Sequence, residues 1–186
     1  MVFFIILFVV ITQRLVELLI AKSNEKWMRN RGAYEVGQAQ YKYIVLVHVF
    51  FFISLISEVV FLQKTLASWW WVPFAFFIIA QSMRVWSLSS LGRFWNTKII
   101  ILPGANVVAK GPYKFMRHPN YVIVSVEILM LPLIFQAYAT AIFFTIANAL
   151  VLSVRICQEE AALQEATDYQ EKFSSRFRFF PTIEKE

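Results

Sequence analysis

The longest apolar stretch of the chain runs for 34 residues, from Tyr121 to Val154. As one straight α-helix this stretch would reach about 51 Å, at 1.5 Å per residue. The hydrocarbon core of a bilayer is only about 30 Å thick, which excludes a single span. Because Pro132 and the polar Gln136 lie near the middle, we expect two membrane-spanning helices joined by a tight turn at about Gln136 to Ala139.

Three more stretches are apolar and long enough to cross a bilayer, namely Val2 to Ile20, Tyr43 to Leu62 and Trp69 to Ser90. The chain is 59% apolar and 16% charged, against about a quarter charged for a soluble domain. These patterns predict an all-α integral membrane protein with five transmembrane helices, the last two forming a hairpin. We expect one membrane domain, with three spans in residues 1–90 and the functional half in residues 91–186.

The basic residues divide unevenly between the two ends of the predicted spans. Residues 22–42, 91–120 and 155–186 each carry five Lys or Arg, whereas the opposite side carries only Lys64. The positive-inside rule then places these loops and the C-terminus in the cytoplasm and the N-terminus outside, for a protein of the cell membrane. The same rule explains the net charge of +6, so we expect membrane lipids and no nucleic acid as partners.

One polar segment, Gly111 to Tyr121, interrupts this apolar pattern with charges, an imidazole, two prolines and two phenols. A second polar group follows the hairpin, where Arg155 and Glu159 share a helix face at a spacing of four residues. Alone, the second group has a simpler interpretation as an i,i+4 ion pair at a helix end. Five spans bring both groups to the same side of the membrane, where they predict a cofactor pocket between the loop before the hairpin and the C-terminal helix.

The loop before the hairpin also contains a short apolar run, Ile99 to Leu102. Three of its four residues are β-branched, a residue type that favours extended backbone. We expect this run to be extended or to lie at the membrane interface.

The sequence lacks the patterns that are typical of several familiar kinds of functional site. The five glycines do not form the spacing of a dinucleotide-binding fold. The Cys and His residues lack metal-ligand spacing, so we expect no metal. No Ser, His and Asp set stands out for nucleophilic catalysis.

The order and spacing of three groups carry a family resemblance. They are Gly111-Pro112-Tyr113, then Arg117-His118-Pro119-Asn120-Tyr121, then Glu159-Glu160 with Leu163. Together they resemble the isoprenylcysteine carboxyl methyltransferase family, over about Asn106 to Pro181. The resemblance implies an integral membrane enzyme that uses S-adenosylmethionine and releases S-adenosylhomocysteine.

The resemblance also implies residue roles. Arg155 matches the arginine that meets the carboxylate of the substrate, as a catalytic and substrate-binding residue. The cofactor would be held by Val107, Val108, Tyr113, His118, Pro119, Asn120, Tyr121 and Glu159.

The chemistry of methyl transfer agrees with these residue types. A sulfonium cofactor is already activated, so the protein needs mainly to align it with an anionic oxygen. Arg155 stays charged and has a fork that can grip a carboxylate or enolate at two points. A carboxylate is ionised at neutral pH and needs no general base. An enol or phenol needs a modest one, and Glu160 is our candidate.

The sequence leaves the methyl acceptor open. A prenylcysteine carboxylate and the hydroxyl of an alkylpyrone-type polyketide lipid both fit. A membrane reductase that uses NADPH and a non-enzymatic membrane adaptor remain alternative interpretations. The sequence also leaves open the oligomeric state and whether Arg84, Arg93 and Glu127 belong to the site.

Overall fold

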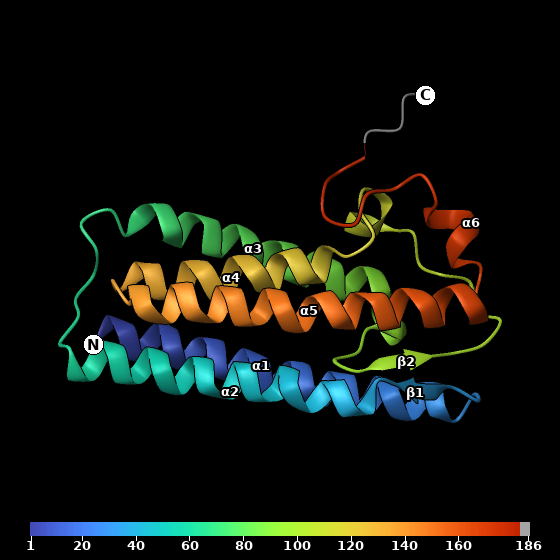
Figure 1. The fold of residues 1–186 in the computed structure, drawn as a ribbon, viewed down its shortest axis with the longest axis horizontal. Helices are drawn as coiled ribbons and strands as arrows, with labels where there is room; N and C mark the ends of the chain where they lie inside the picture. Colours follow the sequence, from blue (N-terminus) through green and yellow to red (C-terminus); the bar gives the residue numbers. More distant parts are fainter. Residues whose placement is uncertain (183–186) are drawn as a thin grey trace.

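The computed structural model describes residues 1–182 of the chain, and it is built from five long helices that lie side by side (Figure 1). The helices α1 and α2 lie on one side of α5, and α3 and α4 on the other. Their bounds are Val2–Arg29 (α1), Gln38–Phe61 (α2), Trp71–Leu91 (α3), Pro119–Ile134 (α4) and Tyr138–Ala166 (α5). The short helix α6, Tyr169–Phe173, follows at the end of α5.

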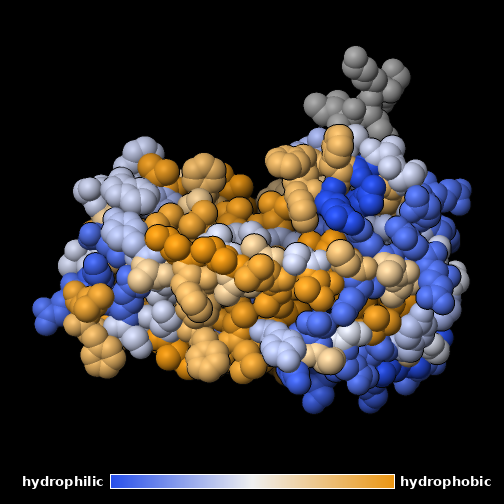
Figure 2. Space-filling model, viewed as in Figure 1, coloured by the Kyte–Doolittle hydropathy of each residue, from blue (hydrophilic) through white to orange (hydrophobic). Residues whose placement is uncertain are grey.

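Four of these helices, α1, α2, α3 and α5, are long and apolar enough to cross a membrane, and α4 is a shorter apolar helix. Large apolar side chains such as Phe8, Phe143 and Leu150 are exposed along them. Figure 2 shows the result as an apolar band over the helices, with hydrophilic residues gathered at the end that carries β1 and β2. The predicted all-α integral membrane fold is therefore confirmed.

The hairpin is present and its turn is short. Helix α4 ends at Ile134 and α5 begins at Tyr138, so the turn lies slightly earlier than the predicted Gln136 to Ala139. Gln136 has a positive φ of 58°, and its side chain donates to the carbonyl of Thr65 over 3.3 Å. Glu58 of α2 accepts a hydrogen bond from the Thr140 N–H over 2.8 Å. The carboxylate thereby satisfies the free N–H groups at the start of α5.

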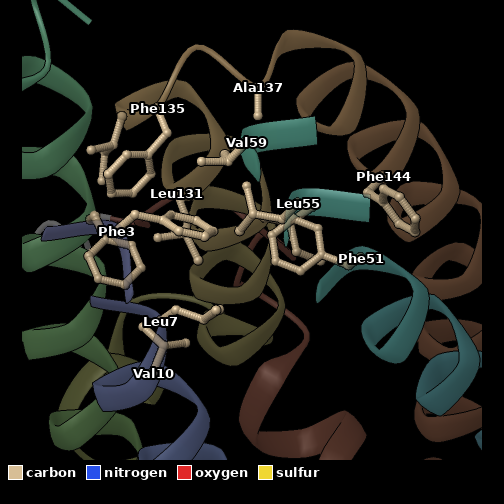
Figure 3. Close-up of a cluster of buried hydrophobic side chains, with 13 residues drawn as sticks. Phe3, Leu7, Val10, Phe51, Leu55, Val59, Leu131, Phe135, Ala137 and Phe144 are labelled. Carbon is tan, nitrogen blue, oxygen red and sulfur yellow. The ribbon is translucent and has the colours of Figure 1, made fainter. Parts of the chain in front are cut away.

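An apolar core fills the bundle at the hairpin end, away from the predicted site (Figure 3). Aromatic rings meet edge to face across helices, with ring centroids 5.0 Å apart for Phe3 and Phe135 and 5.7 Å apart for Phe51 and Phe144. Lipid tails are as apolar as these side chains, so close packing holds the helices together here. The core also contains Leu7, Val10, Leu55, Val59, Leu131 and Ala137.

Two charged side chains whose role the sequence left open pair with each other inside the bundle. Arg84 of α3 donates from Nε to Glu127 of α4 over 2.8 Å, and a second bond joins its Nη2 to the same carboxylate. Arg14 of α1 reaches Glu127 over 2.7 Å and its neighbour Glu17 over 2.6 Å. Arg84 and Glu127 therefore form an internal network between helices.

The region between α1 and α2 is shorter and more ordered than the predicted loop of residues 22–42. Helix α1 continues to Arg29, and the strand β1, Tyr34–Val36, leads into α2. It pairs antiparallel with β2, Ile99–Ile101, in the register Tyr34↔Ile101 and Val36↔Ile99. The β-branched residues of the second strand predict its extended conformation, but no pattern in the sequence predicts its partner strand.

Candidate functional site

A cavity of about 190 Å³ lies at the β1–β2 end of the bundle. Its walls come from the ends of α1 and α3, from β2 and the segments on either side of it, from the loop before α4 and the first residues of α4, and from α5 and α6. Polar side chains in the lining include Asn96, Lys98, Asn106, Asn120, Arg155 and Glu159. The cavity thus combines an apolar strand with several convergent polar groups, as small-molecule sites commonly do.

Most of the predicted site residues line this one cavity. His118 and Arg155 both face it, although one lies in the loop before α4 and the other on α5. The other predicted residues in the lining are Val107, Val108, Tyr113, Asn120, Tyr121 and Glu159. Two predicted residues are not in the lining. Pro119 is the buried first residue of α4, and Glu160 lies behind His118.

Tyr121 connects two charged residues of α5, Arg155 and Glu159. Its hydroxyl accepts a hydrogen bond from Arg155 Nε over 2.8 Å and donates one to Glu159 Oε2. Arg155 Nη2 also donates to the carbonyl of Thr97 over 2.7 Å. Arg155 is only 7% exposed, and its guanidinium is held in place on two sides. The simple i,i+4 ion pair is replaced by a bridge through a phenol.

Glu160, our candidate base for an enol or phenol acceptor, lies outside the cavity lining and is surrounded by basic side chains. Its Oε1 hydrogen-bonds His118 Nε2 over 3.0 Å, and its Oε2 accepts from Arg178 Nη2 over 2.5 Å. Arg117 Nη1 lies 3.7 Å from the same carboxylate. Both oxygens of the Glu160 carboxylate therefore already have hydrogen-bond partners. The carboxylate therefore fixes the ring of His118, which stacks on Tyr121 at a centroid distance of 5.2 Å.

Gly111 fixes the start of the polar segment against α3. Its φ is +55°, a region that side-chain-bearing residues rarely occupy. A Cβ at this position would overlap with Ser90 Oγ and lie 2.9 Å from Trp86 Nε1. The glycine lets the backbone lie directly on α3, and the 3-10 helix η2, Gly111–Lys114, then brings Tyr113 into the cavity wall.

Asp168 holds the loop that contains Val107. Its Oδ1 accepts a hydrogen bond from the Val107 N–H over 2.7 Å. The ion pair with Lys172, 2.7 Å away, lowers the pKa of Asp168 below its ordinary value, and the Val107 N–H contributes to the same shift. No pattern in the sequence indicates this contact, because the two residues are 61 positions apart.

Asn120 has one satisfied and one unsatisfied polar atom. Its Nδ2 donates to the Tyr113 hydroxyl over 2.7 Å. Its Oδ1 is buried and has no partner among the described residues. A buried acceptor without a partner is costly in a protein, so it marks a position where a ligand donor fits.

The region that forms most of this cavity matches a known protein family. A model of the isoprenylcysteine carboxyl methyltransferase (ICMT) family matches residues 71–165, just over half of the chain. The chain belongs to the ICMT family. The match runs from the start of α3 through almost all of α5 and so includes both polar groups of the predicted site, Gly111 to Tyr121 and Arg155 with Glu159. ICMT proteins are membrane methyltransferases that depend on S-adenosylmethionine.

Two relatives extend the similarity beyond the matched region. The uncharacterized protein YpbQ of Bacillus subtilis is 47% identical over 163 residues, which are 88% of this chain and 97% of YpbQ. An uncharacterized protein of Haemophilus influenzae is 31% identical over 151 residues, which are 81% of this chain and 88% of that protein. The similarity to these proteins extends to residues before Trp71, where the ICMT match begins.

The N-terminal half also contributes to the cavity, which sequence reasoning missed. Met28 of α1 is part of the lining. The strand β1 supports β2, and Glu35 of β1 pairs with Lys98 at 3.3 Å. The β-branched run at Ile99 was the available signal for an extended wall. Arg93, whose role in the site the sequence left open, donates to Ser23 on the outer surface.

Proposed function

We propose that this member of the ICMT family transfers a methyl group from S-adenosylmethionine to an acidic oxygen of an amphiphilic lipid. The observation that carries the proposal is the bridge from Arg155 through the Tyr121 hydroxyl to Glu159 in the wall of one cavity. An anion-binding group and an acidic group are thereby held side by side. A cationic cofactor and an anionic acceptor require this combination.

The residues present fit S-adenosylmethionine. The unpaired Oδ1 of Asn120 offers an acceptor to an ammonium or amino group. Glu159 offers a carboxylate to hydroxyl or ammonium groups, and the stacked rings of His118 and Tyr121 offer π-faces to a sulfonium. The backbone at Val107 and Val108 completes the wall with Tyr113, next to the buried Pro119.

When bound, the cofactor supplies a methyl group on a positively charged sulfur. In our proposal Arg155 holds the acceptor oxygen on the opposite side of this methyl group. The cofactor would supply methyl transfer by in-line displacement, in which a C–O bond forms as the S–C bond breaks and a neutral thioether remains. Arg155 Nη1 has no hydrogen bond within residues 1–182, so it remains available to the acceptor.

The arrangement around Glu160 supports a positioning role for this residue. It holds His118 while Arg178 and Arg117 neutralise its charge. An acceptor that is already ionised, such as a carboxylate, needs no proton acceptor at this position. We therefore favour a prenylcysteine-type carboxylate over an enol or phenol such as an alkylpyrone hydroxyl.

The position of the cavity supports a lipidic acceptor. It lies at the end of helices whose apolar side chains are exposed along their length. A lipid lying among these helices would present its polar head to Arg155. The distribution of Lys and Arg supports a cytoplasmic cavity with the N-terminus outside the cell membrane, and we treat the chain as one membrane domain.

Incubation of the purified protein with methyl-labelled S-adenosylmethionine and a lipid extract tests the proposal. We expect a labelled lipid whose methyl group is released by alkali if it is a carboxylate ester. A labelled ether that resists alkali would instead favour the polyketide-type acceptor. Arg155→Ala serves as the matched inactive control.

Isothermal titration separates the proposal from its rivals. We expect S-adenosylhomocysteine to bind and Glu159→Ala to weaken that binding. Binding of NADPH with no binding of S-adenosylhomocysteine would replace the methyltransferase with a reductase. Binding of neither compound would favour the membrane adaptor.

A further inference from the structure

The last described part of the chain, residues 174–182, returns from α6 to the loop before α4; we call it the terminal segment. Its backbone carbonyls at Phe177 and Arg178 accept from the N–H groups of Arg117 and His118, each over 3.1 Å. The Thr182 N–H donates to the carbonyl of Phe115 over 2.8 Å. The terminal segment is therefore fixed against the residues that lead directly into α4.

The terminal segment forms a compact turn. The Phe177 N–H donates to Thr182 Oγ1 over 3.0 Å, which closes residues 177–182 into a loop. Together with the bond from Thr182 to Phe115, this contact brings the aromatic residues of two distant chain segments to one place. Figure 1 shows the segment standing off the side of the bundle beyond α4.

Aromatic side chains on this turn are exposed to an unusual degree. Phe177 is 64% exposed and Phe180 is 72% exposed, and Phe179 and Phe115 beside them are each 41% exposed. Single exposed apolar residues are common in proteins, but four large exposed rings on two segments joined by backbone hydrogen bonds mark a contact surface. These rings lie outside the cavity, so the proposed methyl transfer does not explain them.

Basic side chains are interleaved with these rings. Arg176 and Arg178 alternate with Phe177 and Phe179, and Lys114 precedes Phe115. Figure 2 shows apolar and strongly hydrophilic groups side by side where the terminal segment stands over the helices. Aromatic rings with neighbouring Lys and Arg are typical of a surface that rests in the headgroup layer of a membrane.

The position of the patch identifies its partner. Phe115 directly follows η2, whose Gly111 lies against Trp86 of α3, and the exposed Val85 and Trp86 of α3 belong to the apolar band of the bundle. A bilayer around that band therefore reaches the patch at the boundary between acyl chains and phosphates. Rings suit the acyl side of this boundary, and the exposed Lys114 suits the phosphate side.

We infer that Phe115, Phe177, Phe179 and Phe180 form an interfacial anchor that inserts into the phospholipid headgroup layer beside α4. The anchor fastens the terminal segment, which in turn holds the backbone of His118 and places Arg178 on Glu160. Binding of the anchor to the lipid surface thereby holds in place the wall of the cavity that His118 forms. The inference stands on exposure and position and does not require that methyl transfer occurs.

Site-directed spin labelling in phospholipid vesicles tests the anchor. In full-length protein with Cys157→Ser, the labels replace Phe180 or, as the matched control, the exposed Ser175 of the same segment. Power saturation then measures collisions of each label with oxygen and with a water-soluble nickel chelate. We expect a several-fold lower collision rate with the chelate and a higher rate with oxygen at position 180 than at position 175.

Equal chelate collision rates at positions 180 and 175 would overturn the inference. Strong dipolar broadening between labels at position 180 would also overturn it, because it would show that a second copy covers the rings. A label at Phe177 repeats the measurement in case the Phe180 substitution disturbs the turn. Shielding at position 177 supports the anchor, and chelate access there contradicts it.

Discussion

The guanidinium of Arg155 donates from Nε to the hydroxyl of Tyr121 over 2.8 Å, although 34 residues separate the two positions. The same hydroxyl donates to Glu159 Oε2. One phenol therefore sets the position of the proposed acceptor-binding group and of the proposed cofactor-binding group. Any change to this phenol should affect both kinds of binding.

Tyr121→Phe removes the shared hydroxyl and leaves the ring in place. Hydrogen bonds to charged groups contribute about 1.5–3 kcal/mol, so we expect about tenfold weaker binding of S-adenosylhomocysteine and about tenfold slower turnover. Isothermal titration and labelled methyl transfer measure the two effects. Tyr138→Phe, at the opposite end of the bundle, is the control. Unchanged values in the Tyr121 variant would remove the bridge from the mechanism.

Arg155→Lys keeps the positive charge but loses the planar fork. We expect kcat to fall by about 100-fold, the usual scale for losing one donor to a reacting oxygen. The affinity for S-adenosylhomocysteine should change much less, because Glu159 and Asn120 remain. Turnover equal to that of the native protein would show that Arg155 does not hold the acceptor.

Glu127→Ala leaves Arg84 and Arg14 inside the bundle with Glu17 as their remaining carboxylate. Breaking a buried ion pair costs about 3–5 kcal/mol, so thermal unfolding in detergent should begin at a clearly lower temperature. The double variant Arg84→Met with Glu127→Met should be more stable than the single variant. Glu171→Gln, at an exposed position on α6, is the control. If the single variant unfolds like the native protein, the network does not stabilise the bundle.

Gly111→Ala adds a methyl group that would overlap with Ser90 Oγ. A positive φ alone costs about 1–2 kcal/mol for a residue with a Cβ. Gly104→Ala is the matched control, since Gly104 also has a positive φ but no atom lies within 4 Å of the place that its Cβ would take. We expect the Gly111 variant to lose clearly more stability and more cofactor binding than the Gly104 variant. Equal losses would mean that the contact with α3 is unimportant.

Asp168→Ala removes the carboxylate that holds the Val107 N–H. Because folding lowers the pKa of Asp168 below 3.8, its contribution is complete above that pH and is lost as the pH falls through the lower folded value. Hydrogen exchange of residues 105–109 should therefore be faster in the variant at neutral pH and equal to the native rate in strong acid. Lys172→Ala keeps the carboxylate and should raise the acid midpoint. A difference that persists in strong acid would assign the effect to another contact.

Much of the membrane fold was predictable from the sequence because it depends on local composition. The length of the run from Tyr121 to Val154 forces a turn, and Pro132 and Gln136 mark its position. The distribution of Lys and Arg required an odd number of spans. That number places His118 and Arg155 at the same end of the bundle, and the structure has both in one cavity.

Other features of the site were not predictable from residues close together in the sequence. Glu160 was the candidate base for an enol or phenol acceptor, and only the folded chain shows that Arg178 and His118 pair with it. The strands β1 and β2 form one wall of the cavity, although the whole of α2 and α3 lies between them in the chain. No pattern of neighbouring residues predicts that these two strands pair. The residue types show where charge lies along the chain, but they do not show which charges meet.

The sequence by itself determined that the chain crosses a membrane, that its last spans form a hairpin, and that two polar groups share one side. These properties follow from hydropathy and helix geometry, which act between neighbours along the chain. Only the tertiary structure decided that Tyr121 joins Arg155 to Glu159 and that Glu127 neutralises Arg84. Such contacts depend on how the helices rotate and pack against one another, and that rotation is set by all the side chains at the interfaces together.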